Sequence, residues 1–310
     1  MRCLVTGGAG FIGSNLVDAL LARGDEVTVV DNLSTGRRVN LEPALAAGAE
    51  LVELDIRDGE ALSRLATEKR PERIFHLAAQ IDVRKSLADP FFDAGVNVGG
   101  TANVLEAARA SECGRVVSIS TGGAIYGEGE GQQLPLPENA PIAPLSAYGQ
   151  SKFAAEGYVS LFERLYGVSG VSLRLGNVYG PRQDPLGEAG VIAIFCGLLK
   201  EGGRPKVFGD GTQTRDYIYV GDVVSAALAA GESDATGAIN IGTGVETNVL
   251  ELIEALKGLS GNESFDPEFA PARTGEVQRI TIDAGRARRE LSWRAEMGLE
   301  EGLRVTLDSI

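Results

Sequence analysis

The chain has 310 residues, a formal net charge of −14, and 44% hydrophobic against 23% charged residues. This length provides one large domain or two smaller ones, with a substantial core. The acidic balance argues against nucleic acid as a partner, because neutralising phosphates requires clustered lysine and arginine. A small anionic ligand would need a local cluster of arginines.

The first predicted unit is a strand, a glycine turn and a helix. An apolar run over residues 3–5 precedes Gly7, Gly10 and Gly13, and apolar residues at helical spacing follow over 14–21. Glycine lets the backbone approach a phosphate closely, and the free N–H groups and dipole of a helix N-terminus favour an anion. This order predicts a site for the pyrophosphate of a dinucleotide.

A second predicted strand, over 26–30, ends at Asp31, eighteen residues after Gly13. An acid at about this spacing accepts hydrogen bonds from the adenosine ribose and repels a 2′-phosphate. Arg37 and Arg38 are an alternative signal, since arginine can bind a 2′-phosphate, but they lie in a polar turn. Asp31 therefore favours NAD over NADP.

Strands and helices then alternate along the chain. Expected strands cover 51–54, 73–79 and 115–120, and expected helices cover 58–69 and 91–110. This alternation predicts an α/β fold, a Rossmann doubly wound parallel sheet with helices on both faces. Its ligands are expected outside the carboxyl ends of the strands.

The second half of the chain predicts a smaller α/β substrate-binding domain, because loops, helices and short strands dominate it. One apolar segment, over 239–242, is expected to return to the main sheet. We therefore predict a NAD-binding domain over 1–174 with a return segment at about 218–244. The substrate-binding domain then covers 175–217 and 245–310.

Histidine and cysteine are scarce. The single histidine, His76, lies inside an expected strand, and we interpret it as a core residue. This excludes a Ser-His-Asp triad and a zinc site with several histidines, so we expect no metal. Cys3, Cys113 and Cys196 form no Cys-x-x-Cys pair and are expected to be buried thiols in a reducing compartment. With no signal peptide before the first strand and no apolar run near ~18 residues, we expect a cytoplasmic protein.

A second segment with candidate catalytic residues contains a tyrosine and a lysine that open a predicted helix over 148–166. Tyr148 and Lys152 lie on one helix face, four residues apart. The lysine cation is expected to favour tyrosinate and lower a pKa that is normally ~10, which would make Tyr148 a usable general base. The hydroxyl-bearing strand end at Ser120 and Thr121 is expected close by.

Together these motifs resemble the extended short-chain dehydrogenases/reductases, and within them the UDP-glucose 4-epimerases. The resemblance spans nearly the whole chain. Its motifs are residues 6–13, 31–34, 55–56 and 76–79, Asn97, Tyr148 with Lys152, residues 176–182 and residues 214–217.

The resemblance implies a cofactor, NAD, in the groove at the carboxyl edge of the sheet. The glycine turn would hold the pyrophosphate, the residues around Asp31 the adenosine ribose, and Asp55 with Ile56 the adenine. The implied cofactor-binding residues are Gly7, Gly10, Phe11, Ile12, Gly13, Asp31, Asn32, Ser34, Gly36, Asp55, Ile56, Leu77, Ala78, Ala79, Gln80, Asn97, Ser120, Tyr148, Lys152 and Gly176.

The resemblance also implies the catalytic and substrate-binding residues. Thr121 would hydrogen-bond the sugar oxygen, Tyr148 would be the base, and Lys152 its electrostatic partner. Arginines would bind the nucleotide diphosphate; as bare sequence, Val207 and Phe208 are equally compatible with the core. The implied substrate-binding residues are Arg84, Ser86, Thr121, Tyr148, Asn177, Val191, Val207, Phe208, Arg215, Arg273 and Glu276.

The segment after the fifth strand departs from the family pattern. It has one more residue between the hydroxyl and Tyr126 than many members, and counting back places Gly122 on the catalytic position. A glycine cannot serve there, so we predict Thr121, with Ser120 as the alternative. Related dehydratases and decarboxylases carry an acid just after the catalytic threonine, where this chain has Gly122 and Gly123.

The missing acid favours epimerisation over elimination of water. We predict NAD-dependent epimerisation at C4 of a UDP-sugar, of which UDP-glucose/UDP-galactose is the leading pair. N-acetylated or uronic sugars and dTDP as the nucleotide stay compatible with these residues. The alternatives are a nucleotide-sugar dehydratase or reductase, and a non-catalytic dinucleotide-binding regulator. The resemblance further implies a homodimer formed by helices near 92–110 and 149–165.

Overall fold

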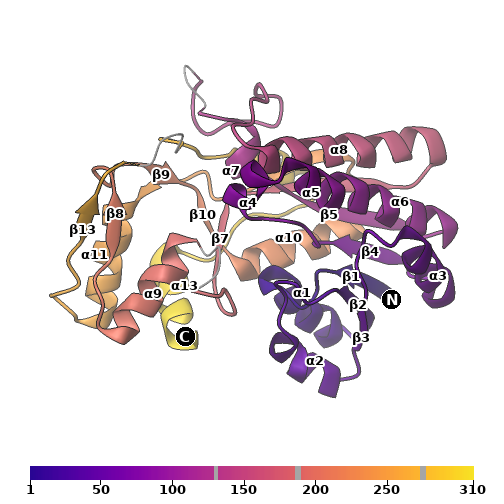
Figure 1. Ribbon diagram of the computed structural model, residues 1–310, viewed down its shortest axis with the longest axis horizontal. Coiled ribbons are helices and arrows are strands. Elements are labelled where there is room, and N and C mark those ends of the chain that lie inside the picture. Colours follow the sequence, from indigo (N-terminus) through magenta and orange to yellow (C-terminus); the bar gives the residue numbers. More distant parts are fainter. Residues whose placement is uncertain (129–131, 186–189, 273–276) are drawn as a thin grey trace.

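The computed structural model describes residues 1–128, 132–185, 190–272 and 277–310. Its centre is a sheet of seven parallel strands (Figure 1), in the order β3 (Glu50–Glu53), β2 (Glu26–Asp31), β1 (Arg2–Thr6), β4 (Arg73–His76), β5 (Arg115–Thr121), β6 (Gly170–Leu175) and β11 (Gly237–Ile241). The strand order reverses between β1 and β4, which confirms the predicted doubly wound Rossmann fold.

Helices cover both faces of this sheet (Figure 1). One face carries α1 (Phe11–Ala22), α2 (Glu42–Ala46) and α10 (Val220–Glu232), and the other carries α3 (Gly59–Lys69), α6 (Gly100–Ala110) and α8 (Ala147–Tyr166). Neighbouring residues of a strand point to opposite faces. Cys3 and Val5 accordingly belong to the first core cluster and Leu4 to the second. The central strands therefore present apolar side chains to both faces of the sheet.

The helix predicted over 91–110 is continuous in space but changes geometry along its length. It consists of α5 (Pro90–Ala94), a π-helical turn η2 (Gly95–Gly99), and α6. The remaining short helices around the sheet are η1 (Arg38–Leu41), α4 (Val83–Ala88), α7 (Gly122–Ile125) and α12 (Gly285–Glu290).

The strand predicted over 73–79 is shorter than expected. β4 ends at His76: Leu77 N–H still donates to the Thr6 carbonyl at 3.0 Å, but Ala78 N–H donates to the Thr6 hydroxyl at 3.3 Å instead of to a backbone carbonyl. The residues after His76 are thus free to line the edge of the sheet instead of extending it.

A second lobe lies beside the sheet (left in Figure 1). It contains α9 (Val191–Glu201), α11 (Val249–Ser260), α13 (Leu299–Ser309) and the parallel pair β8 (Lys206–Phe208) and β13 (Glu268–Ala270). Two small pairs connect it to the sheet: β7 (Asn177–Tyr179) with β10 (Tyr217–Tyr219), and β9 (Thr214–Arg215) with β12 (Thr247–Asn248). It has its own core cluster, in which Phe195 and Phe265 meet edge to face.

Between these pieces the chain returns to the first lobe. β11 pairs with β6, and α10 packs against α1, so both lie with the large sheet within the predicted return segment. No helix of the described residues is long and apolar enough to cross a membrane.

Candidate active site

The glycine turn between β1 and α1 is a close-packed cradle. A Cβ on Gly7, whose φ is +71°, would lie 2.5 Å from the Ala78 nitrogen, and one on Gly13 would lie 2.2 Å from the Gly7 oxygen. Gly10 occupies the N-cap of α1, and no side chain caps this helix. The first N–H groups of α1 are therefore left to a ligand, and the missing Cβ atoms let an anionic group approach them.

Asp31, at the end of β2, joins this cradle. Its carboxylate accepts hydrogen bonds from Ala9 N–H and Leu33 N–H, both at 2.9 Å. A Cβ on Gly36 would lie 2.8 Å from both carboxylate oxygens, so only glycine fits there. Burial raises the pKa of Asp31 above its ordinary value, and the two backbone bonds oppose this shift. A carboxylate offers about four lone-pair sites, so acceptor capacity is left for ribose hydroxyls.

The residues expected around the adenosine also come together. Asn32 Nδ2 donates to Asp55 Oδ2 at 2.8 Å, and Asn32 Oδ1 accepts from the Ser34 hydroxyl at 2.7 Å. The Arg57 guanidinium beside Asp55 holds the pKa of that carboxyl well below its usual range. The Ile56 side chain is buried in a core cluster instead of facing this edge.

Tyr148 and Lys152 lie in the first turns of α8, whose N-cap Ser146 accepts a hydrogen bond from Gly149 N–H at 3.1 Å. The Tyr148 hydroxyl is hydrogen-bonded to the side chain of Thr121, at the end of β5. The Lys152 side chain is buried one turn further along the helix. The structure thus brings Thr121 to Tyr148 and places Lys152 one turn further along the same helix.

The neighbouring hydroxyl, Ser120, has a different partner. It donates to Glu156 Oε1, and Glu156 forms a buried ion pair with Arg174 at 2.7 Å. Arg174 Nη1 also donates to the Tyr126 hydroxyl at 2.8 Å. In the sequence, Glu156 and Arg174 stand out only as charged residues within an otherwise apolar helix face and strand.

The electrostatics of the pair differ from the expectation. Burial raises the pKa of Tyr148 to about 12, and the hydrogen bond from Thr121 opposes this increase. Burial lowers the pKa of Lys152 to about 8, against the effect of the Glu156 and Asp93 carboxylates. The predicted lowering of the Tyr148 pKa by Lys152 is therefore wrong for the protein alone, because desolvation of the phenol dominates.

Segments around α8 are fixed by polar side chains. Gln80 N–H donates to Asn97 Oδ1 at 2.9 Å, and Asn97 Nδ2 donates back to the Gln80 carbonyl at 3.0 Å. Ser86, predicted to bind substrate, is fully buried; its hydroxyl accepts from Tyr148 N–H at 3.1 Å. Ser86 thus holds the backbone of the expected base.

On the side of the second lobe, Gly123 leaves space between two predicted substrate residues. A Cβ there would lie 3.3 Å from Asn177 Oδ1 and 4.0 Å from Thr121 Oγ1. Asn177 N–H donates to the Asp216 carbonyl at 2.7 Å, and Gly176 N–H donates to the Ile241 carbonyl at 3.0 Å. The buried Asp216 carboxylate accepts from Thr243, Gly244 and Ile282. Asp216 lies in the motif over 214–217, and its anchoring role depends on these partners far away in the sequence.

The other predicted substrate residues have varied environments. Arg84 is exposed on α4, Val191 begins α9, and Phe208 is half-buried at the end of β8. Arg215 Nη1 donates to the Thr214 carbonyl at 2.8 Å. Arg273 and Glu276 lie outside the described residues.

The structure corrects the expected contact between the Val207 side chain and the substrate. It is 1% exposed and packs within the core cluster of the second lobe, so its side chain has no surface to offer a base. As a strand residue it points away from the face that its neighbour Phe208 presents.

His76 is a hydrogen-bonded core residue, as predicted. Its Nδ1 lies 2.7 Å from Thr6 Oγ1 and its Nε2 lies 2.9 Å from Thr101 Oγ1. Burial lowers the pKa of His76 to about 3, so the ring is neutral in the folded protein.

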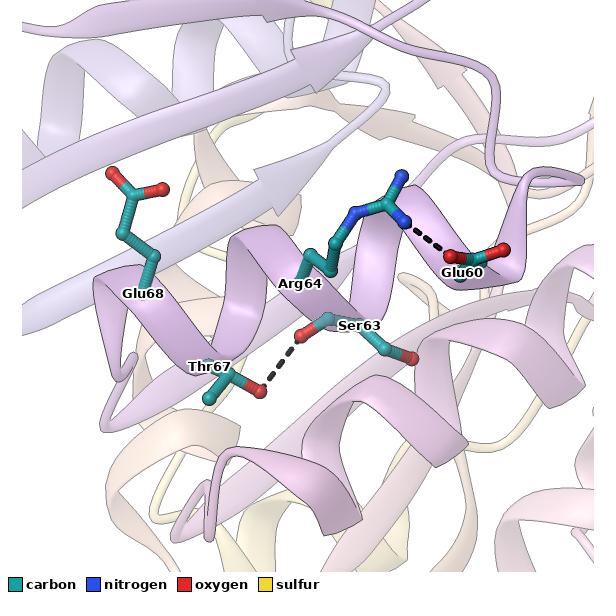
Figure 2. A pocket seen from close by; sticks show the side chains of 5 residues that line it. All are labelled: Glu60, Ser63, Arg64, Thr67 and Glu68. Atoms are coloured by element: carbon teal, nitrogen blue, oxygen red, sulfur yellow. Dashed lines mark hydrogen bonds and ion pairs between the residues drawn. The ribbon is translucent and has the colours of Figure 1, made fainter.

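A shallow hollow on α3 is unrelated to this site. Figure 2 shows its lining residues, Glu60, Ser63, Arg64, Thr67 and Glu68. Arg64 pairs with Glu60 one turn away, and the Thr67 hydroxyl donates to the Ser63 carbonyl at 2.8 Å. None of these residues belongs to the predicted site.

Comparison with known proteins identifies the family. Residues 3–242 match the family described as the NAD dependent epimerase/dehydratase family. The chain belongs to this family. A UDP-glucose 4-epimerase from Mycolicibacterium smegmatis is 47% identical over 310 residues, which cover 99% of this chain and 98% of the relative.

Solved structures of this epimerase/dehydratase family superpose closely on the chain. A UDP-glucose 4-epimerase from Thermotoga maritima, solved with UDP-glucose, has a TM-score of 0.95 and 44% identity, with coverage of 100% of this chain and 98% of that one. The UDP-glucose 4-epimerase of Thermus thermophilus, in complex with NAD, has a TM-score of 0.91 and 43% identity at the same coverage. The resemblance read from the sequence motifs is confirmed.

Proposed function

We propose that the protein is a UDP-glucose 4-epimerase, which interconverts UDP-glucose and UDP-galactose with NAD as cofactor. The observation that carries this proposal is the group formed by Thr121, Tyr148 and Lys152, placed at the same sheet edge as the glycine cradle. The full-length similarity to UDP-glucose 4-epimerases supports it.

The residues present fit NAD. The uncapped N-terminus of α1 and the glycines that admit no Cβ suit its pyrophosphate, and the Asp31 carboxylate suits an unphosphorylated ribose. Gly7, Gly10, Gly13 and Asp31 would hold it. When bound, NAD supplies a hydride acceptor and donor for C4 of the sugar.

The chain's own residues would handle the proton and the orientation. Tyr148 takes the proton of the C4 hydroxyl and later returns it, while Thr121 hydrogen-bonds the same oxygen. The Lys152 ammonium stabilises the tyrosinate form of Tyr148, which is the form that accepts this proton. Asn177 and Arg215, with Arg273, keep the nucleotide diphosphate in place, so that the sugar can turn and present its opposite face.

The direct test supplies the purified protein with UDP-galactose and separates the products by chromatography. We expect UDP-glucose at equal mass, without consumption of added NADH. Loss of one water from the substrate would instead indicate a dehydratase, and consumption of external NAD(P)H a reductase. A panel with N-acetylated and uronic UDP-sugars and dTDP-sugars defines the substrate. If none of these sugars is converted, the proposed epimerase activity is wrong, and the protein is a dinucleotide-binding protein without turnover.

We infer that the protein is a homodimer whose interface includes α4, α5 and α8. These helices pack against one another and carry large exposed apolar side chains, among them Leu87, Phe91, Tyr158 and Leu165. An apolar surface of this kind is typical of a protein–protein interface.

The location and the division into domains are proposed on separate grounds. The three buried, free cysteines suit a reducing compartment such as the cytoplasm. The two separate core clusters suit a cofactor domain over 1–174 and 218–244 and a substrate domain formed by the rest, except that Ala284, Ala287, Leu291 and Trp293 pack in the cluster of the large sheet.

A further inference from the structure

Asp93, on α5, is a buried carboxylate that the proposed chemistry does not yet use. It is fully buried, and its Oδ1 accepts from Gln80 Nε2 at 2.8 Å and from Asn97 Nδ2 at 3.2 Å. Its Oδ2 is also buried and has no hydrogen-bond partner among the described residues. A buried carboxylate with an unpartnered oxygen is costly, so its presence requires an explanation.

Hydrogen bonds connect Asp93 to the first turn of the catalytic helix. Asn97, which the π-helical turn η2 presents, donates from Nδ2 to Ser151 Oγ at 3.0 Å as well as to Asp93. The Ser151 hydroxyl in turn donates to the Tyr148 carbonyl at 3.0 Å. Asp93 is therefore held at a fixed place relative to Tyr148 and Lys152.

The charge of Asp93 acts on both residues. It raises the pKa of the Tyr148 phenol and that of the Lys152 ammonium. Glu156 also raises the pKa of Lys152, but this carboxylate is paired with Arg174.

The other charged groups on the elements packed against α8 are engaged elsewhere or face outward. His76 is neutral, Glu106 and Arg109 form an exposed pair on α6, Arg115 donates to backbone carbonyls and hydroxyls, and Arg84 and Lys85 of α4 are exposed. Asp93 is thus the buried carboxylate beside the Tyr148–Lys152 pair without an arginine or lysine at ion-pair distance among the described residues.

We propose, on the basis of the function proposed above, that Asp93 is a positioning residue that supplies the fixed negative charge of the Tyr148–Lys152 pair. A buried lysine tends to lose its proton, and a neutral amine could not stabilise tyrosinate. The Asp93 charge keeps Lys152 an ammonium. By raising the proton affinity of the phenolate, it also favours transfer of the C4 hydroxyl proton to Tyr148, the step in which this residue acts as base.

The test is the substitution Asp93→Asn, which removes the charge and keeps an oxygen for Gln80 and Asn97. The ionisation of Lys152 is followed by NMR of lysine labelled at Cε, with its signal assigned by Lys152→Met. We expect the pKa of Lys152 to fall by about one unit, the size of shift that a nearby charge produces. In the epimerase assay, the pH profile of kcat should move to lower pH by about one unit, with little change in KM.

The matched control is Asp89→Asn at the N-terminus of the same helix. Asp89 is exposed and caps α5 by accepting from Phe92 N–H at 2.9 Å, which asparagine can also do. This variant loses the same charge in solvent, so neither the Lys152 pKa nor the pH profile should move.

Two results would overturn the role of Asp93. One is an unchanged Lys152 pKa in folded Asp93→Asn; the other is a kcat that falls equally at every pH, as a purely structural role predicts. Asp93→Ser, a smaller neutral variant, serves if the asparagine does not fold, and unfolding of both would make Asp93 structural. Absence of epimerisation by the wild type contradicts the proposed function, whereas the Lys152 titration still reports on Asp93.

Discussion

Two adjacent hydroxyls at the end of β5 show how a single residue position decides the chemistry. Thr121 is hydrogen-bonded to the Tyr148 hydroxyl, whereas Ser120 donates to Glu156 in the buried ion pair. Both partners belong to α8 but lie two turns apart, so each hydroxyl meets a different residue and only Thr121 reaches the base. The sequence placed both candidates at the strand end, and the direction of the side chains separates them.

Substitution of Thr121 by valine should therefore lower kcat by about 10²-fold, the usual contribution of a group that aligns a proton transfer. Ser120→Ala should cost less activity and instead lower the free energy of unfolding by about 1 kcal/mol, because a hydrogen bond to a buried carboxylate is lost. Initial rates and urea denaturation of both variants check this. A larger loss of kcat in Ser120→Ala would assign the catalytic hydroxyl to the other residue.

His76 makes stability depend on pH. Its pKa is lowered from 6.5 to about 3 by burial, so between these values the unfolded chain binds a proton that the folded chain excludes. Stability is complete above pH 6.5 and is lost as the pH falls toward 3. We expect the free energy of unfolding to be about 2 kcal/mol lower at pH 5 than at pH 8 from this residue alone.

The measurement is urea denaturation at both pH values for the wild type and His76→Gln. Glutamine can still form hydrogen bonds with Thr6 and Thr101 but does not titrate. The free energy of unfolding of the variant should therefore decrease less between pH 8 and pH 5 than that of the wild type. An equal decrease in both proteins would exclude His76 as the cause.

At the scale of elements, the cradle at the start of α1 depends on the absence of side chains. A Cβ on Gly13 would lie 2.2 Å from the Gly7 carbonyl oxygen and 2.8 Å from the Gly8 Cα, both backbone atoms that cannot move aside alone. Gly258, in α11, is exposed and has no atom within 4 Å of an added Cβ. Replacing glycine by alanine is thus expected to lower the stability of the protein in α1 and to raise it in α11.

Gly13→Ala should destabilise the protein by about 3 kcal/mol through overpacking and abolish retention of NAD by the purified protein. Gly258→Ala should stabilise it by about 1 kcal/mol, because alanine loses less conformational entropy in a helix. Chemical denaturation and the NAD content of the purified variants test both statements. Normal NAD content in Gly13→Ala would contradict the assigned cradle.

At the scale of the molecule, the two lobes touch next to the cofactor cradle. Arg182, which follows β7 on the side of the second lobe, forms an ion pair with Asp18 of α1 at 2.5 Å. Asn15 Nδ2 donates to the Pro181 carbonyl at 3.2 Å. The helix that offers its N-terminus to the cofactor is therefore also a support for the substrate side.

The outer face of α4, α5 and α8 is the proposed dimer surface, and Phe91, 89% exposed, is its most prominent side chain. Phe91→Glu should shift the protein from dimer to monomer in analytical ultracentrifugation, because a carboxylate cannot be buried there without a partner. Val245→Glu, at an exposed apolar residue of the other lobe, should leave the dimer unchanged. A monomeric wild type, or an equal effect of both variants, would contradict this surface.

The sequence by itself determined the features that depend on local order along the chain. The alternation of strands and helices gave the parallel Rossmann sheet, the glycine spacing gave the cradle before α1, and Asp31 and the Tyr148–Lys152 pair stand at the ends of their elements. Each of these signals is contained within one or two neighbouring elements, so no knowledge of distant contacts is needed.

Only the tertiary structure decided what depends on burial and on partners far away in sequence. It directed Thr121 toward Tyr148, packed Val207 into a core, and raised the pKa of Tyr148 that Lys152 was expected to lower. It also brought Asp93 of α5 beside α8, which no spacing along the chain predicts. Desolvation and charge act through space, and the distances that set them exist only once the chain has folded.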